Sequence, residues 1–294
     1  MSAGDAPNGS ASPAGSRAFA GLQYLLPKRA LSALVRAATR VRIAWFKNAL
    51  IGAFLKFYRV DLAEAAEPAP RAYASFNDFF TRALRPGARP IAPAAEAVAS
   101  PVDGRVSECG TIDGERLIQA KGRDYTLREL LAGRPWARRF EGGSFATIYL
   151  APHDYHRIHM PLDGRLVETV FVPGRLFSVN GATARHVPRL FARNERLLTL
   201  FDTAAGSFAL IMVGALNVAS MATVWNGEIA PPGRGAPTRL PDVDIALGKG
   251  GELGRFNMGS TVILLFEAAR VEFSPTLAAG TCVRVGQAIG RCIA

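Results

Sequence analysis

The sequence has few cysteines and no long apolar run. Among its 294 residues are three cysteines, Cys109, Cys282 and Cys292, which are odd in number and form no CxxC pair. This argues against a disulfide framework and against a thiolate zinc site, and it favours a reducing compartment. No stretch approaches the roughly 20 apolar residues that a membrane-spanning helix needs. We therefore expect no transmembrane helix.

Signals for secretion and for nucleotide binding are also missing. Residues 1–16 are polar and rich in Gly, Ala, Ser and Pro, without the cationic and apolar regions of a signal peptide. We predict that they form a disordered tail of a protein that is not secreted. Neither GxGxxG after a strand nor GxxxxGK[ST] occurs, so no phosphate-binding glycine loop is expected.

Acidic residues are absent from position 6 to position 60. The whole chain carries 35 basic and 24 acidic side chains, for a net charge of +11. Residues 1–66 hold nine basic side chains against three acidic ones, a net charge of +6. This concentration of positive charge predicts a polyanionic partner, either nucleic acid or an anionic membrane surface.

A helix beginning after Pro27 would be amphipathic. At 100° per residue its basic side chains form one stripe, made by Arg29, Arg36, Arg40 and Lys47. The apolar side chains gather opposite: Leu31, Leu34, Val35, Ala38, Val41, Trp45 and Phe46. We interpret residues 17–66 as basic amphipathic helices that lie on an anionic bilayer. The alternative is a helix that packs on its own protein and leaves its basic face in solvent.

The character of the sequence changes after Pro101 to short β-prone runs separated by Gly and Pro. These runs are 145–150, 166–172, 197–201, 208–213, 218–225, 261–266 and 283–289. Helices are expected at 123–131 and in a short segment that carries Phe76, Phe79 and Phe80. The fold class is therefore α+β: N-terminal amphipathic helices followed by a mainly β domain over 67–294, resembling a sandwich or barrel.

Three histidines with a spacing of three stand in one short segment, His153, His156 and His159. A three-histidine metal site is one interpretation. In an extended chain, however, His156 would point away from the other two, which suits two histidines with different tasks. Asp103 before Gly104 and Ser260 after Gly259 are weak signals when taken alone. Together an Asp, a His and a Ser are the parts of a catalytic triad, which the sequence alone cannot assemble.

From about Phe76 to the C-terminus the chain resembles the phosphatidylserine decarboxylase proenzymes, a pyruvoyl-dependent family. The segments that carry the resemblance are Phe-Asn-Asp-Phe-Phe-Thr-Arg-Ala-Leu-Arg-Pro from 76, Ser-Pro-Val-Asp-Gly from 100, Tyr-Leu-Ala-Pro-His-Asp-Tyr-His-Arg-Ile-His-Met-Pro from 149, Phe-Val-Pro-Gly-Arg-Leu-Phe-Ser-Val-Asn from 171, and Gly-Arg-Phe-Asn-Met-Gly-Ser-Thr-Val-Ile from 254. They follow one another in the family's order.

The resemblance implies a cofactor made from the chain itself. Removing CO2 from an α-amino acid leaves a carbanion that needs an electron sink. With five lysines and no phosphate loop, the chain is a poor host for pyridoxal phosphate. By similarity, Ser260 attacks the carbonyl carbon of Gly259, the resulting ester undergoes elimination, and residue 260 becomes a covalent pyruvoyl group. Gly259, which lacks a Cβ, is expected to permit strained backbone angles at this bond.

The resemblance also implies roles for three further residues. His159 is the base for the cleavage and is oriented by Asp103, whereas His156 serves the decarboxylation step. No metal is expected. The products are a β chain of residues 1–259 and an α chain of residues 260–294.

The expected activity is conversion of phosphatidylserine into phosphatidylethanolamine and CO2. Its location would be peripheral, on the cytoplasmic side of the cell membrane, with phosphatidylserine in an anionic bilayer as partner and nucleic acid excluded. Homodimer formation is left open. Two alternatives remain: a metal-dependent hydrolase using His153, His156 and His159, and a non-enzymatic membrane-bound carrier or scaffold.

Overall fold

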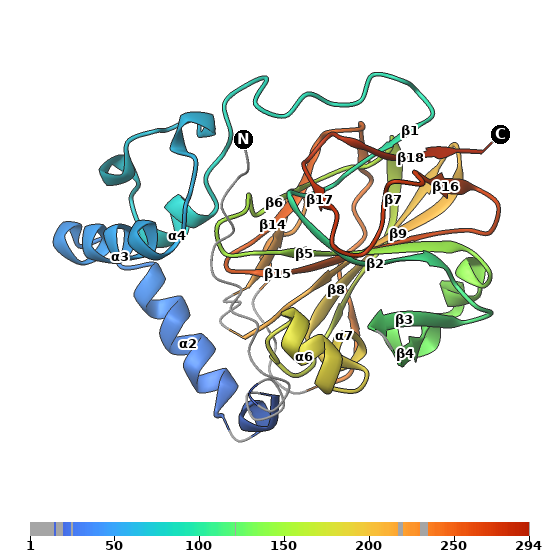
Figure 1. Cartoon of the computed structure of the whole chain (residues 1–294), viewed down its shortest axis with the longest axis horizontal. Coiled ribbons are helices and arrows are strands. Elements are labelled where there is room, and N and C mark those ends of the chain that lie inside the picture. The colour runs from blue at the N-terminus through green and yellow to red at the C-terminus, as the bar shows by residue number, and fades with distance from the viewer. Residues whose placement is uncertain are drawn as a thin grey trace.

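The computed structural model describes residues 15, 20–24, 26–120, 122–216, 220–229 and 235–293. The predicted tail, 1–16, lies outside the described residues except for Gly15. Helices α2 and α3 stand beside a domain of stacked sheets (Figure 1). This arrangement confirms the predicted order of N-terminal helices followed by a mainly β domain.

After a short helical segment at residues 20–24, the described N-terminal part has two longer helices, with a break where the sequence predicted continuous helix through Lys47. Helix α2 (Lys28–Thr39) ends at Arg40, and α3 (Ala44–Phe57) begins after Ile43, whose backbone is extended. The single-turn helices η1 (Leu62–Glu64) and η2 (Pro70–Ala72) follow, and then α4 (Phe76–Phe80). Three phenylalanines of α4 form a small core with α3: Phe76, Phe79 and Phe80.

Three of the four basic side chains in the predicted stripe contact the rest of the protein, while Arg29 is exposed. Arg36 and Arg40 both pair with Glu228 at 2.7 Å. Lys47 is buried and donates to the carbonyl of Arg71 at 2.8 Å. These three basic side chains therefore have partners within the protein, although the side chain of Arg36 is still 39% exposed.

Apolar side chains of the same helices point outward. The most exposed of them are Leu34 at 66%, Ile43 at 57%, Trp45 at 72% and Phe57 at 78%. In the part of the chain that the structure describes, no helix combines the length and the apolar character needed to cross a membrane. The N-terminal helices thus present apolar surface without forming a span.

A large antiparallel sheet forms the centre of the β domain. Its strands follow the order β12 (Thr238–Arg239), β7 (Gly164–Val172), β8 (Arg196–Thr203), β9 (Gly206–Val213), β15 (Ser260–Phe266), β5 (Ser144–Leu150), β2 (Gly104–Thr111) and β17 (Cys282–Val283), and β13 (Ala246–Leu247) also pairs with β7. The order of the described strands has two open ends, so this sheet is not a closed barrel.

Strand β15 is buried along its whole length. Ile263 and Leu265 belong to one hydrophobic core, and Val262 and Leu264 belong to the core on the opposite face. This double burial explains why the sequence shows a continuous apolar run here, without the alternation of a half-exposed strand.

Smaller sheets complete the domain. One has the order β11 (Gly227–Ile229), β10 (Met221–Thr223), β14 (Glu252–Phe256) and β6 (Arg157–His159). A second has the order β1 (Ala97–Ala99), β18 (Ala288–Cys292) and β16 (Val271–Phe273), and β3 (Arg116–Ala120) pairs with β4 (Arg123–Thr126). Short helices cap the ends: α5 (Leu127–Leu130), η3 (Pro135–Phe140), α6 (Gly181–His186) and α7 (Leu190–Arg193).

Three predicted elements differ from the structure. Residues 123–131 form strand β4 before helix α5, because Thr126 starts the helix with a capping box shared with Glu129. The run 283–289 is two strands, separated by a turn in which Gly286 has a φ of +82°. Within 218–225 only 221–223 are a strand, and 218–219 lie outside the described residues.

Candidate active site

The chain passes from one sheet to another at residues 257–259. Strand β14 ends at Phe256, and β15 begins at Ser260 in the central sheet. Asn257 fixes the crossing: its backbone N–H donates to the carbonyl of Ser220 at 3.0 Å, and its side-chain amide donates to Oγ of Ser220 at 2.7 Å. The Gly259–Ser260 bond is therefore held at a defined place between the two sheets.

Ser260 is fully buried at the first position of β15, opposite Leu150 of β5. Its Oγ has no hydrogen-bond partner among the described residues. A buried hydroxyl without a partner is costly, so such groups are rare and need an explanation. An unpaired hydroxyl next to the predicted cleavage bond has the position of a nucleophile.

His156 lies beside this bond. Its Nδ1 donates to the carbonyl of Asp154 at 2.8 Å, so the proton is on Nδ1 and Nε2 carries the lone pair. Nε2 has no partner in the described part of the chain, and a Cβ placed on Gly259 would lie 3.7 Å from it. The imidazole packs against Phe80 at 4.1 Å between ring centroids. Burial lowers the pKa of His156 to about 3, so the ring is neutral at physiological pH.

The backbone at Gly259 does not have the expected strain. Its φ lies outside the left-handed region, and an added Cβ would make only ordinary contacts, 3.7 Å to Nε2 of His156 and 3.8 Å to the carbonyl oxygen of Leu150. The missing side chain instead leaves open the space between the imidazole and the bond.

His159 is held differently, on strand β6. Its Nδ1 donates to the carbonyl of Gly250 at 2.8 Å, so Nε2 accepts from the hydroxyl of Tyr155 at 3.1 Å. Burial lowers the pKa of His159, which also favours the neutral ring. Both nitrogens of this histidine are thus occupied, in contrast to those of His156.

Asp103 is close to β6, but its carboxylate is hydrogen-bonded to residues outside that strand. The backbone N–H of His159 donates to the carbonyl of Pro101 at 2.8 Å, which places the loop before β2 beside β6. The carboxylate accepts from Nε of Arg89 at 3.0 Å and from the backbone N–H of Val285 at 2.8 Å. The hydrogen bonds of the described residues do not join Asp103 to His159 directly. Asp103 and His159 therefore lie in adjacent segments without a hydrogen bond between their side chains.

Two residues at this site were missed by the sequence reasoning. Arg82 is 5% exposed and makes no ion pair with a described residue, and its one side-chain hydrogen bond is to the carbonyl of His153 at 3.3 Å. Burial lowers its pKa. Tyr155 is the partner of His159, and burial raises its pKa. Both lie inside the quoted motifs, where the available signal was that Arg82 stands two residues after Phe80 and Tyr155 directly before His156.

The three histidines do not converge on one point. His153 has a side chain 37% exposed and lies against the ring of Tyr58, 6.4 Å between centroids. Over the described residues, no group of three or more His, Cys, Asp or Glu side chains is arranged to hold a metal ion.

Comparison with known proteins gives the family. Residues 76–291 match the family described as phosphatidylserine decarboxylase, which is more than half of the chain. The chain belongs to the phosphatidylserine decarboxylase family. A second family description, PSD, matches residues 18–59, which include the N-terminal helices.

Relatives in the phosphatidylserine decarboxylase family cover almost the whole chain. A protein of Methylococcus capsulatus is 52% identical over 278 residues, 93% of this chain and 96% of its own length. A protein of Acidovorax ebreus is 53% identical over 274 residues, 92% of this chain and 96% of its own. Both are named phosphatidylserine decarboxylase proenzyme. Membership in this family supports a carboxy-lyase and does not support the metal-hydrolase alternative.

Proposed function

We propose that this protein converts phosphatidylserine into phosphatidylethanolamine and CO2 after it has cut its own chain between Gly259 and Ser260. The observation that carries the proposal is the buried, unpaired Oγ of Ser260 at the crossing between two sheets, directly after Gly259, which lies beside the unpaired Nε2 of His156. The proenzyme names of the relatives agree with a chain that is cut.

In the proposed cut, Oγ of Ser260 loses its proton and attacks the carbonyl carbon of Gly259. The peptide C–N bond breaks, and an ester replaces it. Elimination then releases Gly259 as the carboxyl end of the β chain, residues 1–259, and leaves dehydroalanine at position 260. Addition of water and loss of ammonia convert this residue into pyruvoyl at the head of the α chain, residues 260–294.

We assign the base for the cut to His159, with Asp103 as its orienting carboxylate. The burial of Asp103, the half-buried position of His159 and the hydrogen bond from the backbone N–H of His159 to the carbonyl of Pro101 support this pairing. For His159 to receive the proton, its Nε2 must exchange the hydroxyl of Tyr155 for Oγ of Ser260. Asp103 must likewise turn from Arg89 and replace the carbonyl of Gly250 as the acceptor of the Nδ1–H bond.

The residues around position 260 fit a pyruvoyl group, since the hydroxyl from which it would form already lies in a buried, unpaired position. Such a group would supply a conjugated carbonyl that can react with the substrate amine and accept the electrons of the breaking C–CO2 bond. His156 would first accept a proton on Nε2 from the ammonium group of the substrate, because the neutral ring carries its own proton on Nδ1, and would then return that proton to the carbon that CO2 has left. Phe80 and the surrounding core keep water from this atom.

We further propose that the protein binds the cytoplasmic face of the cell membrane peripherally through its N-terminal helices. A lipid substrate stays in the bilayer, so the enzyme must approach the surface. The exposed side chains of Leu34, Ile43, Trp45 and Phe57 have the size and apolar character for the lipid interface. Flotation with neutral vesicles tests this, with Leu34→Ser/Trp45→Ser expected to lose binding and unchanged flotation counting against these helices.

The chemical proposal is tested by the chain itself. Purified wild type should give two bands on a denaturing gel, and Ser260→Ala should give one. Mass spectrometry of the short fragment should find a pyruvoyl group at its first residue. Active wild-type protein that remains one chain would refute the assignment of Ser260.

A further inference from the structure

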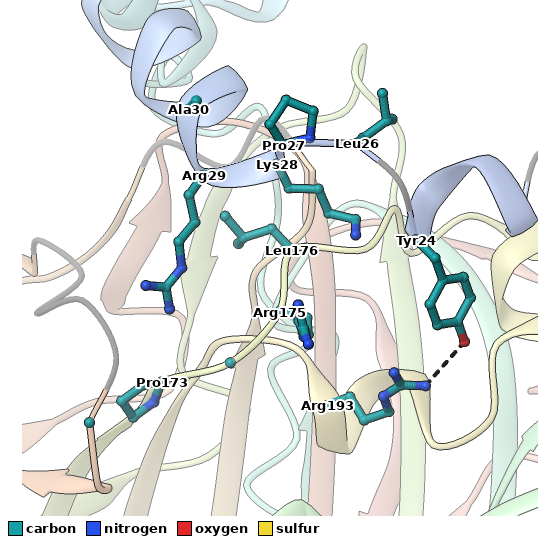
Figure 2. A pocket seen from close by; sticks show the side chains of 12 residues that line it. Tyr24, Leu26, Pro27, Lys28, Arg29, Ala30, Pro173, Arg175, Leu176 and Arg193 are labelled. Atoms are coloured by element: carbon teal, nitrogen blue, oxygen red, sulfur yellow. Dashed lines mark hydrogen bonds between the residues drawn. The ribbon is translucent and has the colours of Figure 1, made fainter.

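A cavity of about 810 Å³ lies between the start of α2 and the β domain. Figure 2 shows the side chains around it. They come from the segment before α2 and its first turn, from the loop that follows β7, and from α7. This cavity is separate from the crossing at residues 257–259, none of which lines it.

Four basic side chains surround the cavity: Lys28, Arg29, Arg175 and Arg193. No acidic side chain of the described residues is among those that line it. Figure 2 shows Lys28 and Arg29 reaching in from α2 while Arg175 and Arg193 face them from the domain. Burial, together with Arg175 and Arg193, lowers the pKa of Lys28. Like charges held this close favour a bound anion.

Aromatic contacts fix two of these cations in place. Nζ of Lys28 lies 4.1 Å from the ring centroid of Phe177, and the guanidinium of Arg193 lies 5.1 Å from the same ring. Arg193 also donates to the hydroxyl of Tyr24 at 3.2 Å. Glu195 interacts electrostatically with Arg29, and burial raises the pKa of Glu195 to about 7. Glu195 is therefore a weak counter-charge at neutral pH.

The cavity and Ser260 lie at the same end of the strands in the central sheet. Val172 is paired with Arg196, Arg196 with Val213, and Val213 with Thr261, which follows Ser260. Three strand spacings separate Val172 from Thr261, roughly 14 Å. The loop that lines the cavity begins directly after Val172.

Exposed apolar side chains lie next to the cavity on the same segment. Leu22 is 54% exposed, Tyr24 is 51% exposed, and Leu34 on α2 is 66% exposed. A binding site for free phosphate would not need such neighbours, whereas an anionic headgroup with acyl chains does.

We propose that this cavity binds the phosphate of an anionic phospholipid that is not the substrate molecule. This binding would turn the strand ends near Ser260 toward the bilayer. The proposal rests on the proposed membrane association. Arg36, Arg40 and Lys47 are engaged within the protein, so the cavity takes over the role that the sequence assigned to the basic stripe.

The test uses full-length protein and phosphatidylglycerol, an anionic lipid without the substrate's amine. Lys28→Met/Arg175→Ala removes two cavity charges, and Arg138→Ala/Arg270→Ala removes two exposed charges near the opposite end of β15. Losing two charges at the membrane surface should weaken binding to vesicles containing phosphatidylglycerol about 30-fold. The matched control, beyond the roughly 10 Å screening length, should change it less than about 3-fold.

Calorimetry with water-soluble dihexanoyl phosphatidylglycerol separates a site from a general field. Wild type and Leu34→Ser/Trp45→Ser should bind this lipid, and the cavity variant should not. Equal losses in the two charge variants would overturn the proposal, as would inorganic phosphate binding as tightly as the lipid at fixed ionic strength. If the wild-type protein does not bind neutral vesicles, the proposed membrane association is refuted instead.

Discussion

The neutral state of His156 predicts how stability depends on pH. The ring is fully buried, and burial lowers its pKa from 6.5 to about 3. Between these values the unfolded chain binds a proton that the folded protein does not bind. The folded-state pKa is depressed, so this contribution is complete above pH 6.5 and is lost as the pH falls toward 3. At pH 5 the loss for this one group is about 2 kcal/mol.

Urea unfolding measures the loss. We expect the uncut Ser260→Ala protein to lose about 2 kcal/mol more stability between pH 7 and pH 5 than Ser260→Ala/His156→Gln, whose side chain does not titrate. The midpoint at pH 7 shows whether the variant folds. His153→Gln in the same background is the control, because the His153 side chain is 37% exposed. Equal losses with and without His156 would refute the reasoning that the buried ring is neutral.

Three further predictions concern the site and its support. His159→Ala should remain one chain on a gel, whereas His156→Ala should be cut but release no CO2; normal cutting of both would contradict the assigned roles. Gly104→Ala should destabilise the protein by about 1–3 kcal/mol in urea unfolding, because its Cβ would lie 2.5 Å from the carbonyl oxygen of Tyr149. Gly52→Ala, with nothing within 4 Å, should be neutral or stabilising. Arg89→Met should cost about 3 kcal/mol by thermal unfolding, because it leaves the carboxylates of Asp103 and Glu64 without their shared cation; an unchanged melting temperature would show that this network contributes little.

The sequence predicted the strands of the central sheet because their burial is visible in composition. Residues 261–266 are apolar without alternation, and β15 is buried on both faces. The helix predicted for residues 123–131 was wrong in its first half, because a local helical pattern could not reveal the pairing of Arg123–Thr126 with β3. That pairing depends on a partner strand, which sequence periodicity does not contain.

For the N-terminal helices the sequence predicted amphipathicity but not its direction. Either face of α2 could pack on the domain, and the choice depends on Glu228, almost 200 residues away in the chain. For the active site, the sequence motifs assigned Ser260, His156, His159 and Asp103 to one site. They could not show that Asp103 is bonded to Arg89 or that His159 is bonded to Tyr155.

The central place of β15 has a consequence for the lifetime of the protein. This strand pairs with β5 on one side and with β9 on the other, so the sheet must be assembled before the Gly259–Ser260 bond is positioned. If the chain is cut as proposed, only molecules that have folded lose the covalent bond between Gly259 and Ser260. A mature molecule that later unfolds releases a separate 35-residue chain and cannot refold by the pathway that the uncut single chain followed. Its durability is then set by the rate of unfolding and not by an equilibrium.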